Sequence, residues 1–600
     1  MRRLIRLQFE DAKQILDKGS RRHGIDDTIA TFRKLHYTLR QEYHDSLVTM
    51  TVYVDSVMPI WKRMTDILPP KPVCDRLVAA YMDITESITR IVHFPTFREQ
   101  YNLFWDGKLQ SDYFLPQLLS MLAIVSRFTT KSQGFGHERV EGVHTPTAFA
   151  LVRTWLDGLT GKDLVDLVVI QIELLLMVCR RALMFRPQEL WVPLGKIVRM
   201  AMTMGLHRDP SELGTRITPF VGEMRRRLWY AVCELDTQTS FDSDLPCSIR
   251  PDEYTCSPPQ NLNDEDIYPG MKELPVGKPI EEHTSMRHAV LGSISLSTRA
   301  RISQLLSRID TLKDYREIIE LGDKLDDVLE DMDRILPRHN ITDHSRMSRV
   351  WRERVSSDAH VRRPLLALYR PFALNAPACP PQITKSFLRS CMVVLEYSSE
   401  PDPRDPHHTE IIGILHQVFR NDILPAAFSV CYFIQALNKP SVNGSYDSHR
   451  GRSHSPNTPT RSPALSIEGH FLWSPERLLR AVQRTLEYLT QSIVRNTGTK
   501  DIVALAVVLE MVRTPEPKTE DIAQALHVTL DACLKAANTS REKLAMTHIN
   551  HARTSVPPGF TPDPYLGGQM GGMGYADASS NRHESHDMPG GAWTMWGGWE

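Results

Sequence analysis

The run His207-Arg208-Asp209 has residue types and an order that could support phosphoryl transfer. Protein kinases begin their catalytic loop with these three residues, and an asparagine five positions after the aspartate holds magnesium. Gly214 stands at that position, and neither a glycine-rich strand nor an Asp-Phe-Gly run occurs in the required places. The sequence therefore predicts that His207 and Arg208 lie at a helix C-terminus, where cationic side chains favour the negative end of the helix dipole.

Zinc binding is the next chemistry to test, because nine cysteines occur in the chain, at positions 74, 179, 233, 247, 256, 379, 391, 431 and 533. Thiolate zinc sites usually contain pairs of cysteines separated by two to four residues. No pair here has a two-residue gap, and the closest two, Cys247 and Cys256, are nine positions apart. Isolated cysteines are usually buried as small apolar side chains. We therefore predict reduced intracellular thiols, no metal site and no other cofactor.

Other catalytic patterns are also missing from the sequence. It contains no G-x-S-x-G elbow, no H-E-x-x-H pair and no P-loop lysine signature. Glycines gather over residues 567–574, but no strand pattern precedes them and no helix pattern follows. They indicate a low-complexity tail rather than a phosphate-binding loop. No coherent set of acid, base and nucleophile emerges, so we predict that the protein is not an enzyme.

Two amphipathic helical patterns must position the His207-Arg208-Asp209 run. The first comprises Leu190, Leu194, Ile197, Val198 and Ala201, and the second comprises Val221, Met224, Leu228, Val232 and Leu235. Apolar residues at steps of three and four predict helices that bury one face. Gly205 stands where a left-handed residue would close the first helix. Leu228 and Trp229 are predicted to be core residues of the second.

The second helix carries three consecutive arginines, Arg225, Arg226 and Arg227, ahead of a loop over residues 242–266 that is rich in Asp, Pro and Asn. The arginines are predicted either to form a solvated face or to pair with this acidic loop, and both are favoured over contact with DNA. Asp236 is expected to pair with one of the arginines or to accept neighbouring backbone N–H groups. Either contact would fix the loop on the helices without a catalytic purpose.

Helical periodicity continues over most of the chain, and few segments alternate with period two, so the predicted fold class is all-α. Leu68-Pro69-Pro70-Lys71-Pro72 should break the first helical segment, and a later helix should end at Pro371. The predicted organisation is an N-terminal helical segment with its Pro-rich break at 1–72, a helical core at 73–266, its helical extension at 267–438, a disordered Ser/Pro linker at 439–467, a helical segment at 468–540 and a disordered Gly/Met/Trp tail at 541–600.

Charge and hydropathy limit the classes of partner. The formal net charge of -1 gives no global attraction to nucleic acid. The most apolar run, residues 423–437, is about 15 residues long and contains Pro425, whereas a membrane span needs roughly 20 apolar residues. We therefore predict a buried helix there and no membrane association, and any DNA contact should be local or supplied by a partner.

Three separated motifs resemble the middle regulatory region of fungal zinc-cluster transcription factors. They are Arg90-Ile91-Val92-His93-Phe94-Pro95-Thr96-Phe97, the segment 190–266 with its His207-Arg208-Asp209 run, and Leu368-Tyr369-Arg370-Pro371-Phe372. The resemblance implies an all-α regulatory domain in a nuclear transcription regulator that controls a metabolic or biosynthetic gene set. It marks seven family-motif positions with structural roles, namely His207, Arg208, Asp209, Arg226, Trp229, Asp236 and Pro246.

Two departures separate the chain from the family pattern. Asp244-Leu245-Pro246 stands where the family usually has Gly-Arg-Pro, and no C-x2-C-x6-C zinc cluster occurs. Because the family reads DNA through that cluster, two hypotheses stay open: DNA contacts are lost or supplied by a partner, or the chain is a fragment of a longer factor that carries the cluster. A helical enzyme is the least favoured hypothesis. The expected partners are other transcription factors or coactivators, in a homodimer or heterodimer.

The linker and the tail each carry a pattern of their own. Proline follows each of three candidate phosphorylation residues in the linker, Ser455, Thr458 and Ser462. Phosphate there would reverse the positive local charge, whereas the alternative is a plain Pro/Ser spacer. In the tail, tryptophan recurs every third residue at positions 593, 596 and 599. Such aromatic residues can fold onto a coactivator, and the alternative is a tail without a partner.

Overall fold

The computed structural model describes residues 25–554 apart from internal stretches. The stretches not described are residues 87, 127–141, 184, 309–314, 338–348, 376–378, 399, 401–412, 414, 416–417, 439–472, 495–497 and 515–516. Within the described residues the secondary structure consists of 18 α-helices and three 3-10 helices, with no strand. The all-α prediction is therefore confirmed. The predicted linker, with Ser455, Thr458 and Ser462, and the tail tryptophans lie outside the described residues.

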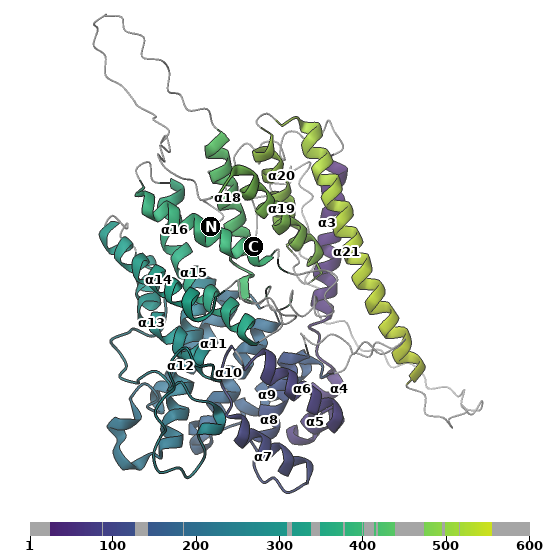
Figure 1. Ribbon diagram of the computed structural model, residues 1–600. Coiled ribbons are helices and arrows are strands. Elements are labelled where there is room, and N and C mark those ends of the chain that lie inside the picture. The colour runs from purple at the N-terminus through teal and green to yellow at the C-terminus, as the bar shows by residue number, and fades with distance from the viewer. Residues whose placement is uncertain are drawn as a thin grey trace, which may run out of the picture.

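The proline-rich segment at 68–72 lies between the first helices and α6 in the sequence. The helices on its two sides are α3 (Ile25–Asp45), α4 (Thr51–Val54), α5 (Ile60–Asp66) and α6 (Lys71–Ile84). Pro72 lies in the first turn of α6, where the missing N–H has no helical partner to lose. The helix is thus interrupted over residues 67–70, while Lys71 and Pro72 of the predicted break already belong to α6. Helices α4 and α5 pack on α9 in the lower right of Figure 1.

Helix α8 forms the centre of the lower part of the molecule, where it contacts α6, α9 and α10 (Figure 1). The bounds here are α7 (Phe94–Trp105), α8 (Phe114–Val125), α9 (Thr145–Asp157) and α10 (Leu167–Ala182). Every residue of α8 is buried, because its sequence FLPQLLSMLAIV is apolar on nearly all sides. Its polar residues bond inside the protein, since Gln117 donates to Gln171 and Ser120 donates to the carbonyl of Pro116.

Helices α11 (Pro187–Thr203) and α12 (Pro219–Ser243) are the two predicted on either side of the His207 run. All five apolar residues of the α11 pattern are buried, and Gly205 has a left-handed φ of 70°, as predicted. Helix α12 differs, because it contacts α10, α11, α13 and α15 and buries most of its length. It is the central helix of the fold rather than a surface helix with one apolar face.

A second group of helices follows the irregular connection over residues 244–286. Its members are α13 (Arg287–Leu306), α14 (Tyr315–Ile335), α15 (Arg349–Asn375), α16 (Pro381–Ser398) and α18 (Ile423–Asn438). Helices α13, α14 and α16 pack around α15, and α18 packs on α16. The apolar run at 423–437 falls in α18, whose residues are mostly buried, so the prediction of a buried helix is confirmed. None of the described helices is both long and apolar enough to cross a membrane.

Helix α15 corrects one prediction, because it continues past Pro371 and also contains Pro364. An internal proline costs about 3 kcal/mol, since it removes a helical hydrogen bond and crowds the preceding turn. Leu365, Leu366 and Leu368 are buried around the two prolines. Each buried leucine contributes about 1.5–3 kcal/mol. Packing against neighbouring helices therefore outweighs the local cost that predicted a helix end.

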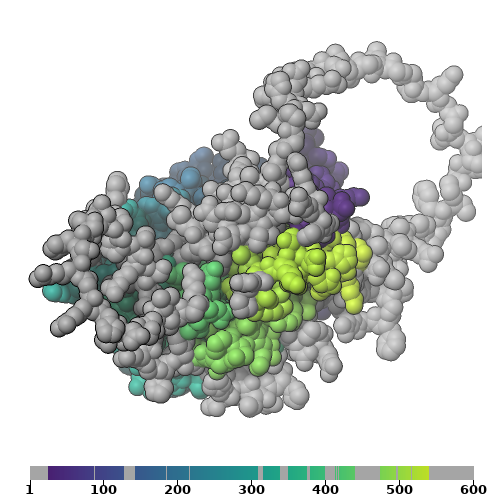
Figure 2. Space-filling model, turned by 90° about the horizontal axis from the view of Figure 1, so that it is seen from above, coloured from purple at the N-terminus to yellow at the C-terminus, as the bar shows by residue number. Residues whose placement is uncertain are grey.

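The first and last helices of the described chain share one core. Helix α3 packs against α20 and α21, and these pack on α19. The bounds are α19 (Pro475–Gln491), α20 (Thr499–Arg513) and α21 (Thr519–Thr554). Figure 1 shows α3 and α21 running together at the right, and Figure 2 shows the purple N-terminal residues beside the yellow-green C-terminal ones. The backbone of α21 also continues beyond residue 540, where the sequence predicts the start of the tail.

Candidate functional site

Helix α12 carries ionisable side chains into the interior of the protein. Glu223, Arg227, Glu234 and Asp236 are each at most 6% exposed. A buried charge costs several kcal/mol unless it is paired or hydrogen-bonded. The partners of these four residues come from α13, from α15 and from the connection between α12 and α13, residues 244–286, which we call the α12–α13 loop.

Carboxylates on α12 hold the α12–α13 loop by its backbone. Asp236 Oδ2 accepts hydrogen bonds from the N–H groups of Ser248 and Ile249, at 2.8 and 3.0 Å. Glu223 Oε1 accepts another from the N–H of Gln260, at 3.1 Å. Backbone N–H groups in an irregular segment need such acceptors, because no ladder or helix supplies them. Of the two contacts expected for Asp236, the structure thus forms the one with backbone N–H groups.

Asp209 sits at the start of the 3-10 helix η2 (Pro210–Arg216) and joins it to α12 and to the α12–α13 loop. Its carboxylate makes a bidentate ion pair with Arg226, at 2.9 and 3.1 Å. It also accepts the N–H groups of Ser211 and Ser257, at 3.0 and 2.9 Å. Burial alone would raise the pKa of Asp209, but these hydrogen bonds hold it well below its usual value. Both oxygens are occupied, so the residue is structural.

Asp264 connects the α12–α13 loop to the segment that precedes α7. Its oxygens pair with Arg227 at 2.7 Å and with Arg90 at 2.8 Å. The N–H of Phe94 donates to the same carboxylate at 2.9 Å, and His93 Nε2 lies 2.9 Å from the backbone carbonyl oxygen of Asp264. Burial raises the pKa of Asp264 while the two arginines lower it, and the net shift is downward. The motif at 90–97 and the segment 190–266 therefore meet at one carboxylate.

A second buried cluster centres on Glu234, between α12, α13 and α15. Arg299 donates to both carboxylate oxygens at 2.8 and 2.7 Å, and the Tyr230 hydroxyl donates at 3.0 Å. His360 Nδ1 lies 3.3 Å from the same carboxylate. Burial opposes ionisation of Glu234, but Arg299 holds its pKa well below the usual value. Gly292 permits this close approach, because a Cβ there would lie 2.0 Å from the Tyr230 hydroxyl.

Asp242, near the end of α12, extends the ion pairs to α10, α15 and the residue before α18. Arg181 pairs with it at 2.8 Å and Arg363 at 3.3 Å. Arg363 also pairs with Asp422 at 2.7 Å. Each of these four side chains is at least four-fifths buried. Ion pairs along α12 thus tie together helices that lie far apart in the sequence.

The structure brings the family-motif residues together around η2 and α12. The carbonyl oxygen of His207 accepts two backbone N–H groups of the α12–α13 loop, and Arg208 is exposed. Trp229 is 2% exposed, with its ring 6.1 Å from that of His207. The carbonyl of Pro246 accepts the indole N–H of Trp191 at 2.9 Å. Together with Asp209, Arg226 and Asp236, these residues fix how the chain turns between α11, α12 and the loop.

The three consecutive arginines do not form a solvated face. The sequence left this arrangement open as an alternative to pairing with the acidic loop. Arg225 donates to the carbonyl of Met204 at 3.0 Å, at the C-terminal end of α11. Arg226 binds the carboxylate of Asp209. Arg227 binds the carboxylate of Asp264, which belongs to the acidic loop. Because α12 is central rather than peripheral, its polar side also faces protein.

Buried arginines outside the motifs were missed by sequence reasoning. They include Arg287, Arg299, Arg352, Arg354, Arg362 and Arg363. One signal was available, since Arg354, Asp358 and Arg362 recur at four-residue steps that place ion pairs on one helix face. Both pairs form, at 3.0 and 3.2 Å. The motif at 368–372 lies on the same helix but apart from Asp209, with Tyr369 packed against Gly322 of α14.

The arrangement is not suited to covalent chemistry. Among the described residues, no group of His, Cys, Asp and Glu side chains could hold a metal ion. The carboxylates of Asp209, Asp236 and Asp264 are bound by arginines or backbone N–H groups, so none is placed as a general base or nucleophile. Burial raises the pKa of the Cys74, Cys256 and Cys391 thiols to about 12, which suppresses the reactive thiolate. The ion pairs fix the positions of helices.

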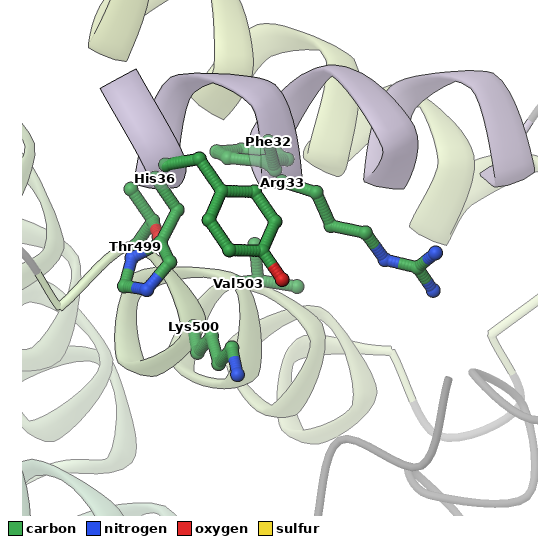
Figure 3. Close-up of a pocket in the computed structure, with 7 residues that line it drawn as sticks. Phe32, Arg33, His36, Thr499, Lys500 and Val503 are labelled. Atoms are coloured by element: carbon green, nitrogen blue, oxygen red, sulfur yellow. The ribbon is translucent and has the colours of Figure 1, made fainter. Parts of the chain in front are cut away.

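A small groove lies between α3 and α20 (Figure 3). It is lined by Phe32, Arg33, His36 and Tyr37 from α3 and by Thr499, Lys500 and Val503 from α20. Its volume of about 10 Å³ admits about one water molecule. Small-molecule sites occupy roughly 300–1,000 Å³. The groove is therefore a packing seam between the N- and C-terminal helices.

Comparison with known proteins finds a family model and several relatives that are similar to part of this chain. A family model described as the fungal specific transcription factor domain matches residues 78–334. The transcription factor opdR of Penicillium oxalicum is 34% identical over 58% of this chain and 44% of its own length. The Zn(2)-C6 fungal-type transcription factor pigI of Monascus ruber is 29% identical over 43% of this chain and 31% of its own length. The equisetin cluster transcription factor eqxF of Fusarium heterosporum is 24% identical over 75% of this chain and 63% of its own length.

The chain spans less than two thirds of the length of each of these relatives. No solved structure matches it. The matched residues 78–334 contain Asp209, Arg227 and Asp264 and the ion pair of Glu234 with Arg299, whereas His360 of the Glu234 cluster lies beyond them. Residues 78–334 of the chain are thus similar to the fungal specific transcription factor domain, and these relatives are named as transcription factors.

Proposed function

We propose that this protein regulates the transcription of a secondary-metabolite gene cluster from within the nucleus. Similarity to transcription factors supports a nuclear location. Support for the gene set comes from relatives whose names specify one, the equisetin and fusarisetin A cluster transcription factors, each matched over 75% of this chain. The observation that carries the proposal is the match of a fungal specific transcription factor domain over residues 78–334.

The proposed mechanism works through protein contacts, with DNA contacts supplied by a partner. Support comes from the nine cysteines, none of which has the two-residue spacing of a zinc cluster, and from the near-zero net charge. The described cysteines are single thiols rather than grouped ligands. Homodimers and heterodimers with other transcription factors, or complexes with coactivators, would provide the missing contacts.

The second candidate is a zinc-cluster factor of which this chain is one part. It is favoured by the short overlap with the relatives, because this chain covers only 31% of the Zn(2)-C6 factor pigI. In that case the protein would bind its own DNA site through residues encoded upstream. An in-frame C-x2-C-x6-C in the genomic sequence ahead of Met1 would support this candidate and contradict the first.

A tethered reporter tests the regulatory role. The full chain is fused to an unrelated DNA-binding domain and directed to a reporter promoter, with the DNA-binding domain alone as control. We expect reporter transcription to change relative to the control, and an unchanged reporter would contradict the proposal. In the source organism, deletion of the gene should alter expression of one contiguous set of biosynthetic genes.

A separate measurement addresses the DNA contacts. The purified chain is mixed with promoter fragments from that gene set, and binding is followed by gel mobility at low and moderate salt. We expect the chain alone to cause no sequence-specific shift in mobility. A shift should appear when a nuclear extract that contains a partner is added. Specific binding by the chain alone would show that it reads DNA itself.

A further inference from the structure

The α4–α5 segment carries several exposed apolar side chains close together in the sequence. Within residues 47–61, six apolar side chains are each more than a third exposed, namely Val48, Met50, Val52, Val57, Met58 and Trp61. The segment contains one charged residue, Asp55. Single exposed apolar residues are ordinary, whereas a cluster on the order of several hundred Å² marks a contact surface. We call these six residues the α4–α5 apolar surface.

The backbone under this surface is anchored, so the apolar side chains are not exposed by a loose loop. Arg63 donates to the carbonyls of Tyr53 and Val54, at 3.2 and 2.8 Å. The N–H of Met50 donates to the hydroxyl of Thr147 on α9, at 2.9 Å. Leu47, Tyr53 and Ile60 face inward and pack against the core. A surface held in place by its own scaffold binds with little loss of conformational freedom.

The sequence of the chain contains a segment that fits this surface chemically. Residues 593–599 read WTMWGGW, with three tryptophans, one methionine and no charge. Tryptophan gains most from burial against apolar side chains, and methionine adapts to irregular ones. We propose that residues 593–599 of the C-terminal tail dock on the α4–α5 apolar surface of the same molecule.

The length of the tail makes this contact accessible. Residues 555–592 connect the end of α21 to Trp593. A random-coil chain of about 38 residues has a root-mean-square span of about 35 Å. Figure 1 shows the C-terminal end of α21 toward the same end of the molecule as α4 and α5. Tethering gives an effective concentration on the order of 1 mM, so a contact with a dissociation constant of about 100 μM would be about 90% occupied.

A second copy of the chain is the competing occupant, because homodimer interfaces are also apolar at their centre. A standard interface buries about 800 Å² on each partner, which is more than six partly exposed side chains supply. A tethered segment needs no such area, since its second binding event is intramolecular. A tail held on α4 and α5 withholds its tryptophans from other proteins until it is released.

Hydrogen exchange of the full-length protein tests the contact from both sides. In the triple variant Trp593→Ala, Trp596→Ala, Trp599→Ala, we expect amides in residues 47–61 to exchange up to about ten-fold faster, the protection that 90% occupancy provides. In the double variant Val52→Asp, Val57→Asp, exchange in residues 591–600 should rise in the same way. Both valines are exposed, so the fold should be retained.

Val192→Asp is the matched control, because Val192 on α11 is 70% exposed and Val52 is 72% exposed. It should leave exchange in the tail unchanged. The proposal is overturned if neither surface responds to substitution of the other. It is also overturned if protection of residues 47–61 falls on dilution while sedimentation shows a dimer, because a second copy then covers the surface.

A labelled peptide of residues 588–600 provides an independent measurement. Fluorescence anisotropy should show about ten-fold tighter apparent binding to the triple tryptophan variant than to the wild-type chain, because the tail of the wild type competes for the surface. The Val52→Asp, Val57→Asp substitutions placed in the triple variant should abolish this binding. Equal binding to wild type and triple variant would overturn the proposal.

Discussion

Three buried aspartates on or beside α12, namely Asp209, Asp236 and Asp264, differ in pKa because their partners differ. Burial raises the pKa of Asp236 to about 6, since its acceptor contacts with backbone N–H groups do not offset the lost hydration. The same burial acts on Asp209 and Asp264, but arginine partners bring their pKa values below the usual range. Asp209 and Asp264 thus form ion pairs with arginines, whereas Asp236 accepts hydrogen bonds from backbone N–H groups.

Replacing Asp264 with asparagine should test the ion-pair centre. Asp264→Asn leaves Arg90 and Arg227 buried without the charge they share. Breaking a buried pair by removing one partner costs about 3–5 kcal/mol. The urea midpoint of unfolding, followed by circular dichroism, should fall accordingly. The matched control is Asp331→Asn in the exposed pair with Arg334, where little change is expected, and equal midpoints for the two variants would show that the buried pairs do not stabilise the fold.

Asp236 should make stability depend on pH in a direction that its raised pKa fixes. The folded-state value of about 6 lies above the usual 3.8, so the folded protein binds this proton more tightly than the unfolded chain does. The resulting stabilisation is present below pH 4 and is lost as the pH rises through 6. Relative to Asp236→Asn, the wild-type unfolding free energy should therefore fall by roughly 2–3 kcal/mol between pH 4 and pH 6. Urea titrations at several pH values measure this, and a constant difference would contradict the assignment.

At the scale of the helices, α11 and α12 show which structural features local periodicity predicts and which it does not. Helix α11 has one buried face, so its apolar spacing identifies the core residues and its end at Gly205. Helix α12 is buried on most sides, and the same spacing wrongly allows a solvated face for its arginines. The partners of Arg227 and Glu234 are Asp264 and Arg299, 37 and 65 positions away. Such pairs are set by tertiary packing, which a local pattern does not contain.

The α12–α13 contact depends on the absence of a side chain at Gly292. In Gly292→Ala the new Cβ would lie 2.0 Å from the Tyr230 hydroxyl oxygen and 3.3 Å from its ring carbon Cζ. Overpacking costs about 1–3 kcal/mol, which exceeds the gain of about 0.5–1 kcal/mol from alanine in a helix. We expect a lower thermal midpoint for Gly292→Ala and partial recovery in Gly292→Ala, Tyr230→Phe, which removes the closest atom.

The double substitution separates two causes of instability. Recovery shows that the hydroxyl is the obstacle, because phenylalanine keeps the ring and loses only the oxygen. A double variant that is as unstable as the sum of the singles would instead mean that Gly292 acts through the α13 backbone. Tyr230→Phe alone measures the loss of its hydrogen bond to Glu234.

At the scale of the whole molecule, the ends of the described chain meet outside the region that the family match covers. The match ends at residue 334, whereas α3 lies before it and α20 and α21 lie after it. The sequence predicts each of these helices but not their contact, because no local signal pairs residues almost 500 positions apart. The consequence is a coupling between the N-terminal segment and the C-terminal helices from which the tail departs.

Phe32 is the residue through which this coupling can be measured. It is 1% exposed on α3 and shares the seam in Figure 3 with the buried Val503 of α20. Truncation of a buried phenylalanine costs about 3–5 kcal/mol. Phe32→Ala should therefore increase amide exchange in α20 and α21 as well as in α3, while α8 and α10 keep their protection. Lys34→Ala, on the same helix but exposed and not among the residues that line the seam, should leave all of these rates unchanged. Faster exchange confined to α3 would mean that the C-terminal helices fold without it.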